Sequence, residues 1–486
     1  DKELTLEELG ARVSSSDGDF TLGILSDGKL STYGTLCPEE GYSWIRYDFP
    51  RMVTFMAATV CSDAMRGRYI PVPADVHLIL ECSESGTDWR EVALIPDDVL
   101  GSMTVDFPET TAAHWRLKIL PGEGSYARKR ILREFVLHPV RKVNHSEEKS
   151  GFAAQHDFMD FPTPDSGDAI TDVIPLGLPD KEGKISCDLP EGRWKIYRFG
   201  QALTGKKNHP ASADATGLEV DKLDTEAWTN HFHSYLDLYK EASGGLIGSR
   251  GIRYILTDSY EAEQMTWTKN MFAEFSSRKG YDLHEWLPAL AGEILVSSAQ
   301  TEKFLWDWRE VIGDLFKENY DRINDIVDEY GMMGRFTEAH ELGRLFVGDG
   351  MDIKMTASVP MSAIWMEDTP TGHRFSHARM DIKESSSTAH VFGQNIAAAE
   401  AFTVSGVKGH AYTYSPENLK RTADFALWNG LNRFVVHDSA HQPRDDKMPG
   451  TGLFQYGQWF NRHETWASMA RSWTDYLSRS CYMLSR

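Results

Sequence analysis

The stretch Ile252-Arg253-Tyr254-Ile255-Leu256 runs directly into Thr257-Asp258-Ser259-Tyr260-Glu261, so that a short apolar run ends on carboxylates. Three later stretches repeat this arrangement: residues 332–336 lead into Thr337-Glu338-Ala339-His340, residues 362–365 into Met366-Glu367-Asp368, and residues 396–399 into Glu400-Ala401-Phe402. Short apolar runs are typical of buried parallel strands, whose carboxyl ends gather at one mouth of an α/β barrel. A single carboxylate at such a place can equally cap the following helix, and only the succession favours a site.

Helical patterns separate most of these runs. Residues 226–242 and 301–330 carry apolar positions at helical spacing, which we interpret as core, and a last helix is expected from about residue 464 to 484. Strand-like segments occur near residues 196, 254, 335, 364, 397 and 434. Alternating helices and strands predict an α/β fold of the (β/α)8-type barrel class over residues 186–486.

The first part of the chain has a different pattern. Short alternating segments at residues 43–49, 76–82 and 114–119 are separated by turns, and such spacing predicts a β-sandwich over residues 1–145. The order of these segments resembles discoidin-like sandwiches of carbohydrate-binding modules, although a packing module that binds nothing is an equal alternative. Polar, turn-rich residues 146–185 are interpreted as a connection, followed by a predicted strand pair over residues 184–200.

The charge of the chain restricts its partners. With 51 Lys and Arg against 72 Asp and Glu, the formal net charge is −21, which argues against nucleic acid and against an anionic membrane surface. A neutral ligand fits better. The 14 Trp and 23 Phe beside many carboxylates suit sugar binding, but the same rings can simply form the core.

Cysteines and apolar runs restrict the class further. The five cysteines are too scattered for a disulfide framework or a thiolate metal cluster, although one bridge, Cys61 with Cys82, stays open. No apolar run approaches the ~18 residues of a membrane helix, and the first residues show no signal-peptide pattern. The chain is therefore expected to be soluble or to begin after a cleavage point.

Strings spread over the second half of the chain resemble one family. They are Thr204-Gly205, residues 208–211, residues 217–223, residues 257–262, residues 279–283, residues 304–307, Thr337-Glu338-Ala339, residues 399–403, residues 432–437, residues 439–443 and residues 457–462. In this order they resemble glycoside hydrolase family 106, the calcium-dependent α-L-rhamnosidases, over roughly residues 170–486. The resemblance implies an α/β barrel, an inverting mechanism, a Ca²⁺ ion that helps to hold rhamnose, a rhamnose-containing oligo- or polysaccharide as partner, and a periplasmic or secreted location.

Two glutamates are the candidate catalytic pair. Inverting hydrolysis needs a protonated carboxyl group and an ionised carboxylate, ~6.5–9.5 Å apart, on opposite faces of the sugar. By the resemblance, Glu261 is the acid and Glu400 the base, and the two roles can be exchanged. A barrel-interior residue paired with an Arg is the alternative for Glu400, since a buried carboxylate needs a partner.

The remaining polar residues are assigned to metal and sugar. Glu338 and Glu367 are expected to hold Ca²⁺, which prefers hard oxygen ligands; the chain has no Asp-x-Asp-x-Asp-Gly loop, so separated strands would have to build the site. Asp258 and four histidines are candidates for sugar hydroxyls, with a structural histidine as the default reading of each. The histidines are His209, His340, His437 and His441.

One departure from the family pattern affects the prediction. Family members carry their first barrel strands before the inserted sandwich, whereas this chain starts inside or just ahead of it, so we expect a fragment or a truncated product with a barrel that is incomplete at its N-terminal side. Two alternatives to a rhamnosidase remain: a glycosidase of other sugar specificity, and a non-catalytic sugar-binding protein with a truncated barrel. The presence of both Glu261 and Glu400 argues against the latter.

Overall fold

The computed structural model describes residues 4–37, 41–62, 78–96, 101–120, 130–153, 161–192, 194–209, 211–262, 265–340, 346–366, 373–404, 412–448, 450–453, 456 and 458–486. The chain forms two compact units that interleave along the sequence. The antiparallel unit comprises Asp1–Thr204, Thr266–Ile312 and Leu345–Val347, and the parallel unit comprises Gly205–Met265, Gly313–Arg344 and Gly348–Arg486.

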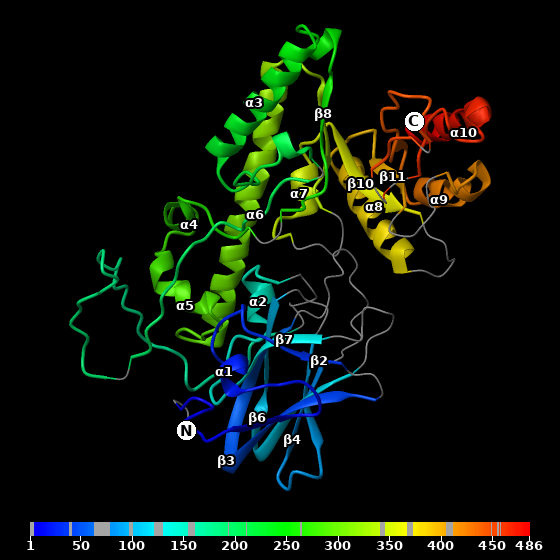
Figure 1. Cartoon of the computed structure of the whole chain (residues 1–486). Helices are drawn as coiled ribbons and strands as arrows, with labels where there is room; N and C mark the ends of the chain where they lie inside the picture. Colours follow the sequence, from blue (N-terminus) through cyan, green and yellow to red (C-terminus); the bar gives the residue numbers. More distant parts are fainter. Residues whose placement is uncertain are drawn as a thin grey trace. The chain divides into compact units, whose positions relative to one another are not determined.

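The antiparallel unit contains a seven-stranded sheet of order β2-β7-β3-β6-β4-β5, with β1 paired to β3 (Figure 1). Burial alternates along the start of β3, so that Ile45, Tyr47 and Phe49 enter the core. Trp115 of β6 is fully buried there and meets Phe55 edge to face at 5.2 Å. The strands are β1 (Arg12–Ser15), β2 (Gly34–Leu36), β3 (Ser43–Ser62), β4 (Leu78–Ser83), β5 (Arg90–Ile95), β6 (Gly101–Ile119) and β7 (Arg130–His138).

The β-sandwich expected over residues 1–145 stays a prediction, because the strand pairings join all seven strands into one continuous sheet. β3 and β6 pair along nearly their whole length, from Ser43 opposite Ile119 to Ser62 opposite Gly101, with register shifts that let the long strands bend. The seven strands therefore belong to one hydrogen-bonded sheet. Cys61 and Cys82 are both buried and free, so the bridge between them is not formed.

The predicted strand pair at residues 184–200 is wrong. Residues 184–192 and 194–200 contain no strand, and Ile196 is 73% exposed, so the alternation of apolar residues does not face a core. Lys195 and Tyr197 contact the carboxylate of Glu293 instead of a neighbouring strand. The expected barrel strand near residue 196 is therefore absent from the described part of this segment, because side-chain contacts rather than a ladder hold it.

Short helices complete the antiparallel unit. Trp308 of α6 is fully buried, and its indole nitrogen donates to the carbonyl of Ser150 at 3.0 Å. Lys149 forms an ion pair of 2.6 Å with Glu302 of the same helix. The helices are α1 (Leu22–Leu25), α2 (Ser146–Lys149), α4 (Met271–Lys279), α5 (Leu287–Leu290), the first part of α6 (Ser298–Glu329) and the 3-10 turn η4 (Leu283–Trp286).

The parallel unit contains a five-stranded parallel sheet of order β12-β11-β10-β9-β8. Each strand lies beside the next one in the sequence, which is the connectivity of a barrel rather than of a doubly wound sheet. The strands coincide with five of the six predicted positions: β8 (Tyr254–Thr257), β9 (Gly334–Glu338), β10 (Val359–Trp365), β11 (Ala398–Thr403) and β12 (Arg433–Val436). The described residues thus supply a parallel barrel-like sheet, not a complete barrel.

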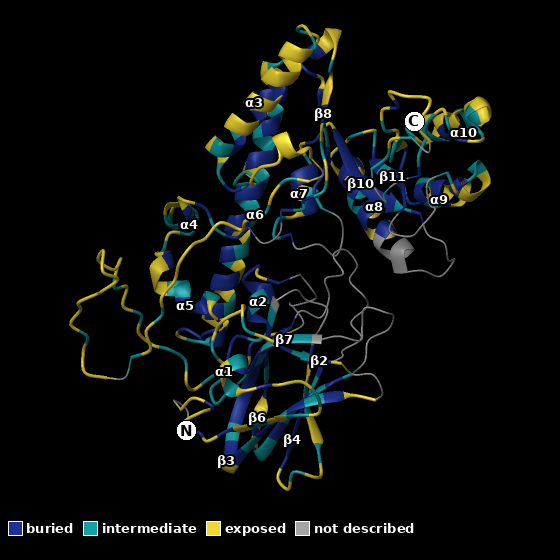
Figure 2. Ribbon diagram, in the orientation of Figure 1, coloured by how far each residue is buried: buried dark blue, intermediate teal, exposed yellow. Residues whose placement is uncertain are grey.

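The two faces of this sheet have different neighbours. Ile364, Ala399 and Ala401 pack in one apolar cluster with α8 (His373–Val391), α9 (Pro416–Trp428) and α10 (Ala470–Leu484). Met361 and Ala398 belong to a small cluster on the other face. Figure 2 shows β10 and β11 as buried strands, while α9 and α10 carry buried and exposed stripes. Register places Glu338 opposite Met361, so that Glu338 lies on the face away from these three helices.

Three helices of the chain coincide with the helical segments predicted at residues 226–242, 301–330 and 464–484. α3 (Thr225–Ala242) is capped at its N-terminus by Asp224, whose carboxylate accepts from the backbone NH of Glu226 at 3.1 Å. The other helical elements of the parallel unit are the second part of α6, α7 (Gly350–Lys354), α8 (His373–Val391), α9 (Pro416–Trp428), α10 (Ala470–Leu484) and the 3-10 turns η2 (Ala213–Ala215), η3 (Gly248–Arg250) and η5 (Ala467–Met469). Among the described residues, no helix has the length and apolar composition needed to cross a membrane.

Candidate active site

Three carboxylates from three strands meet on one face of the parallel sheet. Oxygens of Asp258, Glu338 and Glu400 all lie within 4.8 Å of one another. Thr257 pairs with Thr337, so the next residues, Asp258 and Glu338, stand side by side at the carboxyl ends of β8 and β9. The sequence predicts a different role for each of these three residues, namely sugar binding for Asp258, metal binding for Glu338 and catalysis for Glu400, but the structure places them in one cluster.

Glu400 reaches this cluster from within β11. It pairs with Ala363 of β10, and Met361, two residues earlier on β10, pairs with both Glu338 and Ala398. Since residues two apart in a strand point to the same face, Glu400 and Glu338 share a face although β10 lies between their strands. Ala363 has only a methyl side chain, which leaves room for the two carboxylates to approach over it.

A bulge beside Glu400 aims a hydroxyl at it. Ile364 pairs with Ala401 but Trp365 pairs with Thr403, so Phe402 is an extra residue in β11. Phe402 has a φ of 72°, and its fully buried ring stacks on Phe434 at 5.5 Å, which holds the strained backbone in place. The bulge returns Thr403 to the face of Glu400, where its hydroxyl donates to Glu400 Oε1 at 2.6 Å.

Glu261, the predicted acid, is not part of the three-carboxylate cluster. It follows Tyr260, whose backbone NH donates to the carbonyl of Ala339 at 3.1 Å and whose buried ring meets Phe316 edge to face. These contacts tie the segment after β8 to the end of β9. The carboxylate of Glu261 accepts from Ser259 Oγ at 3.3 Å and lies 3.9 Å from Nδ1 of His209.

The other predicted histidines occupy different surroundings. His340 follows β9, and its Nε2 lies 3.3 Å from a carboxylate oxygen of Glu384 in α8. His437 follows β12, and its backbone NH donates to the carbonyl of Ala401 at 2.9 Å. His441 is exposed in the segment after β12. The predicted metal ligand Glu367 lies outside the described residues.

Lys354, a buried lysine paired with carboxylates, was not among the predicted site residues. Lys354 of α7 is fully buried and bonds Glu384 at 2.6 Å, with Asp381 at 3.7 Å. Although burial opposes ionisation, the charge of Lys354 lowers the pKa of Glu384 to about 2, whereas burial raises the pKa of Asp381 to about 6. Glu384 thereby remains an ionised acceptor for His340. All three residues lie in helical segments, where charged residues usually face solvent, so no sequence signal marked them.

Asp438 is a further carboxylate that follows a parallel strand and was not among the predicted site residues. It follows β12 as Asp258 follows β8, and burial raises its pKa. Two backbone hydrogen bonds hold Asp438 in position. Its NH donates to the carbonyl of Gln458 at 3.2 Å, and its carbonyl accepts from the NH of Phe460 at 2.9 Å. The signal is present in the sequence, because a strand is predicted near residue 434 and Asp438 is the acidic residue that follows it.

The three-carboxylate cluster fits a hard divalent cation. Asp258, Glu338 and Glu400 bring up to three negative charges together and offer only oxygen donors, which is the donor set that Ca²⁺ prefers over softer metals. No histidine or cysteine takes part in this group among the described residues. Sugar hydroxyls are also hard oxygen donors, so the same place suits a cation shared between protein and sugar.

Comparison with known proteins relates this geometry to a family. A solved rhamnosidase from Novosphingobium sp. PP1Y matches with a TM-score of 0.73 and 34% sequence identity, over 91% of this chain and 41% of that chain. A protein of Formosa agariphila named putative beta-glucuronidase is 36% identical over 305 residues, 63% of this chain and 25% of the relative. The chain thus spans less than half the length of either relative. A family described as alpha-L-rhamnosidase matches residues 26–486, and because this match takes in nearly all of the sequence, the chain belongs to glycoside hydrolase family 106.

Proposed function

We propose that this chain carries the catalytic centre of an inverting, exo-acting α-L-rhamnosidase that removes terminal L-rhamnose from oligo- or polysaccharides outside the cytoplasm. The observation that carries the proposal is the convergence of Asp258, Glu338 and Glu400 on one face of the parallel sheet. Family membership supplies the reaction class, and the cluster supplies acidic groups at the edge where barrel enzymes place their chemistry.

Glu400 acts as the base in this proposal. Thr403 donates to Glu400 Oε1 and so orients this carboxylate, which accepts the proton of a water molecule. The oxygen of that water forms a bond to the anomeric carbon while the glycosidic bond breaks. Glu261 gives its proton to the departing oxygen, and Ser259, which donates to Glu261 Oε1, fixes the orientation of that carboxyl group.

Asp258 and Glu338 are the proposed protein ligands of Ca²⁺. When bound, the ion supplies positive charge that orients two neighbouring hydroxyls of the sugar. In this proposal His209 and His340 bond further hydroxyls, and the contact of Glu384 with Nε2 of His340 supports the orientation of that ring. We assign no role to His441, which is exposed in the described structure.

Glutamine variants test the pair. Glu400→Gln and Glu261→Gln should each lower turnover of nitrophenyl α-L-rhamnoside by roughly 10²- to 10⁴-fold, since each removes one acid or base group. Glu417→Gln, at an exposed glutamate in the first turn of α9, is the matched control. Proton NMR of the first product should show β-rhamnose from an α-linkage. Unchanged turnover in a variant excludes that residue, and α-rhamnose as first product excludes inversion.

A second candidate is a glycosidase that acts on a uronic acid, because the relative from Formosa agariphila is named putative beta-glucuronidase. Release from nitrophenyl β-D-glucuronide without release from the rhamnoside would favour this candidate. Turnover of neither glycoside, with retained sugar binding, would favour a non-catalytic protein. Exhaustive chelation tests the metal: we expect activity to fall and Ca²⁺ to restore it, and full activity after chelation contradicts the assignment of Asp258 and Glu338.

A further inference from the structure

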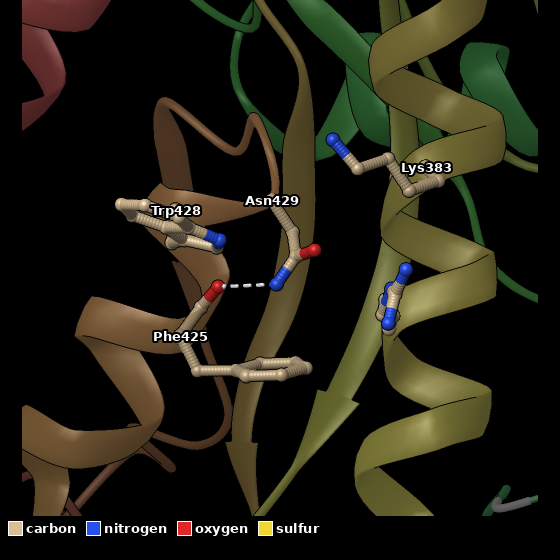
Figure 3. A pocket seen from close by; sticks show the side chains of 5 residues that line it. Lys383, Phe425, Trp428 and Asn429 are labelled. Atoms are coloured by element: carbon tan, nitrogen blue, oxygen red, sulfur yellow. Dashed lines mark hydrogen bonds between the residues drawn. The ribbon is translucent and has the colours of Figure 1, made fainter.

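A pocket of about 400 Å³ lies between α8 and α9. Arg379, Lys383, Phe425, Trp428 and Asn429 line it, and Figure 3 shows Lys383 on one side with Phe425, Trp428 and Asn429 on the other. We call it the α8–α9 pocket. Its volume falls in the range of ~300–1,000 Å³ that is usual for sites of small ligands.

Helical spacing explains why these residues converge. Arg379 and Lys383 are four apart and stand on one stripe of α8, while Phe425, Trp428 and Asn429 are three and four apart at the end of α9. The opposite stripe of α9 is buried through Leu419, Ala423 and Ala426. Arg379, Lys383 and Trp428 are exposed, whereas Phe425 packs against the apolar cluster and Asn429 is buried at the end of α9, so the pocket reaches from the surface to the core.

Trp428 is the most unusual of the five. It is 88% exposed, although Trp is normally among the more buried residues. A single exposed ring is common on protein surfaces and carries no argument alone. Here the ring stands beside a pocket that Phe425 also lines. An exposed aromatic ring is the group that covers the apolar face of a pyranose.

The two cations of the pocket have no acidic partner among the described residues. Lys354 and Lys420 are held by Glu384 and Asp424, whereas Arg379 and Lys383 are both exposed and have no ion pair with any described residue. Arg379 and Lys383 lie one helical turn apart on α8, so two positive charges stand close together in a chain of net charge −21. They form a local attraction for an anion that the rest of the surface would repel.

The pocket is separate from the catalytic centre. α8 and α9 pack on the face of the parallel sheet that includes Ala399 and Ala401, while Glu338 and Glu400 point to the other face. A ligand in the α8–α9 pocket therefore cannot be the sugar that is cleaved at Glu400. Any role of the pocket is auxiliary binding.

We propose that the α8–α9 pocket binds a pyranose that carries an anionic group, a carboxylate or a sulfate ester. The sugar ring stacks on Trp428, and the anionic group lies between Arg379 and Lys383. The amide of Asn429, whose nitrogen bonds the carbonyl of Phe425 at 2.8 Å, directs its oxygen into the pocket toward a hydroxyl. This site goes beyond the proposed function, and it stands or falls independently of the sugar cleaved at Glu400.

Affinity electrophoresis of the whole chain tests the proposal. Native gels would contain polygalacturonate, κ-carrageenan or fully methyl-esterified pectin, which supply a carboxylate, a sulfate ester and a neutral sugar respectively. The Glu400→Gln background prevents hydrolysis and keeps the test apart from catalysis. We expect retardation by at least one of the two anionic polymers and none by the neutral one, and which of them retards the chain identifies the anionic group.

Variants locate the binding. Trp428→Ala, and the double variant Arg379→Ala with Lys383→Ala, should weaken the apparent Kd about tenfold or more, since each removes ring stacking or charged hydrogen bonds. The matched control is the double variant of Arg471 and Arg479 to Ala, which removes the same charge from exposed side chains of α10. Circular dichroism checks folding. Three results would each overturn the proposal. The first is an apparent Kd within twofold of the parent in both pocket variants. The others are an equal weakening in the control variant and an equal retardation by the neutral polymer.

Discussion

Replacing Lys354 by Met should destabilise the parallel unit strongly. The side chain of Lys354 is fully buried and bonds Glu384 at 2.6 Å and Ser385 Oγ at 2.9 Å, with Asp381 at 3.7 Å. Met fills a similar volume but leaves the buried carboxyl group of Asp381 and the half-buried one of Glu384 without this cation. Removal of one partner from a buried ion pair costs roughly 3–5 kcal/mol.

The pKa of Glu384 gives an independent magnitude. It lies at about 2 against an ordinary value of 4.5, and each tenfold change in proton affinity corresponds to about 1.4 kcal/mol, so the interaction with its surroundings contributes roughly 3 kcal/mol. Because the pKa is depressed in the folded state, this contribution is complete above pH 4.5 and is lost as the pH falls toward 2. The difference between Lys354→Met and the parent should therefore be largest near neutral pH and shrink in acid.

Hydrogen exchange of peptides from β10 and β11, followed by mass spectrometry, measures this free energy without treating the two units as one transition. Lys420→Met is the control, because Lys420 pairs with Asp424 on the surface and its loss should leave protection unchanged. Two results would contradict this prediction: a loss of unfolding free energy below about 1 kcal/mol in Lys354→Met at pH 7, or a loss at pH 3 as large as that at pH 7. Either result would mean that the ion pair of Lys354 does not stabilise the folded unit.

Three further changes test the other unit and the site. Trp115→Ala removes a fully buried ring from the antiparallel core and should cost roughly 3–5 kcal/mol in urea unfolding, whereas Trp428→Ala should change stability little. Glu293→Gln removes the carboxylate that accepts from Lys142, Lys195 and Tyr197. Burial opposes the ionisation of Glu293, but the two lysines lower its pKa to about 2, so its contribution to stability is present above pH 4.5. The thermal stability of the variant should therefore approach that of the parent as the pH falls toward 2. Thr403→Val should lower kcat while leaving the melting temperature nearly unchanged, and a kcat equal to that of the parent would mean that the hydroxyl does not position Glu400.

The parallel strands were the most predictable part of the fold. β8 to β12 are short, apolar and followed by polar residues, and such runs can be recognised without knowledge of their partners. The segment around residue 196 has the same alternation, yet it forms no strand among its described residues. A strand exists only where another strand completes its ladder, and this condition cannot be tested on one segment alone.

The sequence identified the residues of the three-carboxylate cluster, but it did not show that they lie together. Sequence position marked Asp258, Glu338 and Glu400 as residues at strand ends, but their separate roles came from the family resemblance. The cluster that joins them depends on register, because the pairings of Thr257 with Thr337 and of Met361 with Glu338 decide which carboxylates share a face. Lys354 was beyond prediction, since its position in the sequence is that of an ordinary exposed lysine of a short helix.

The alanines of β11 are a signal whose meaning only the structure explains. Alanine is a poor strand residue, yet Ala397, Ala398, Ala399 and Ala401 surround Glu400 and all are buried. On one face, Ala399 and Ala401 let the helices approach closely; on the other, Ala398 together with Ala363 leaves space for carboxylates from two strands away to meet. Ala363→Leu tests this reading: the larger side chain should separate Glu400 from Glu338, and turnover should fall by more than any loss of stability accounts for. If Ala363→Leu retains the turnover of the parent, the small side chains of this face serve packing alone and the approach of the carboxylates does not depend on them.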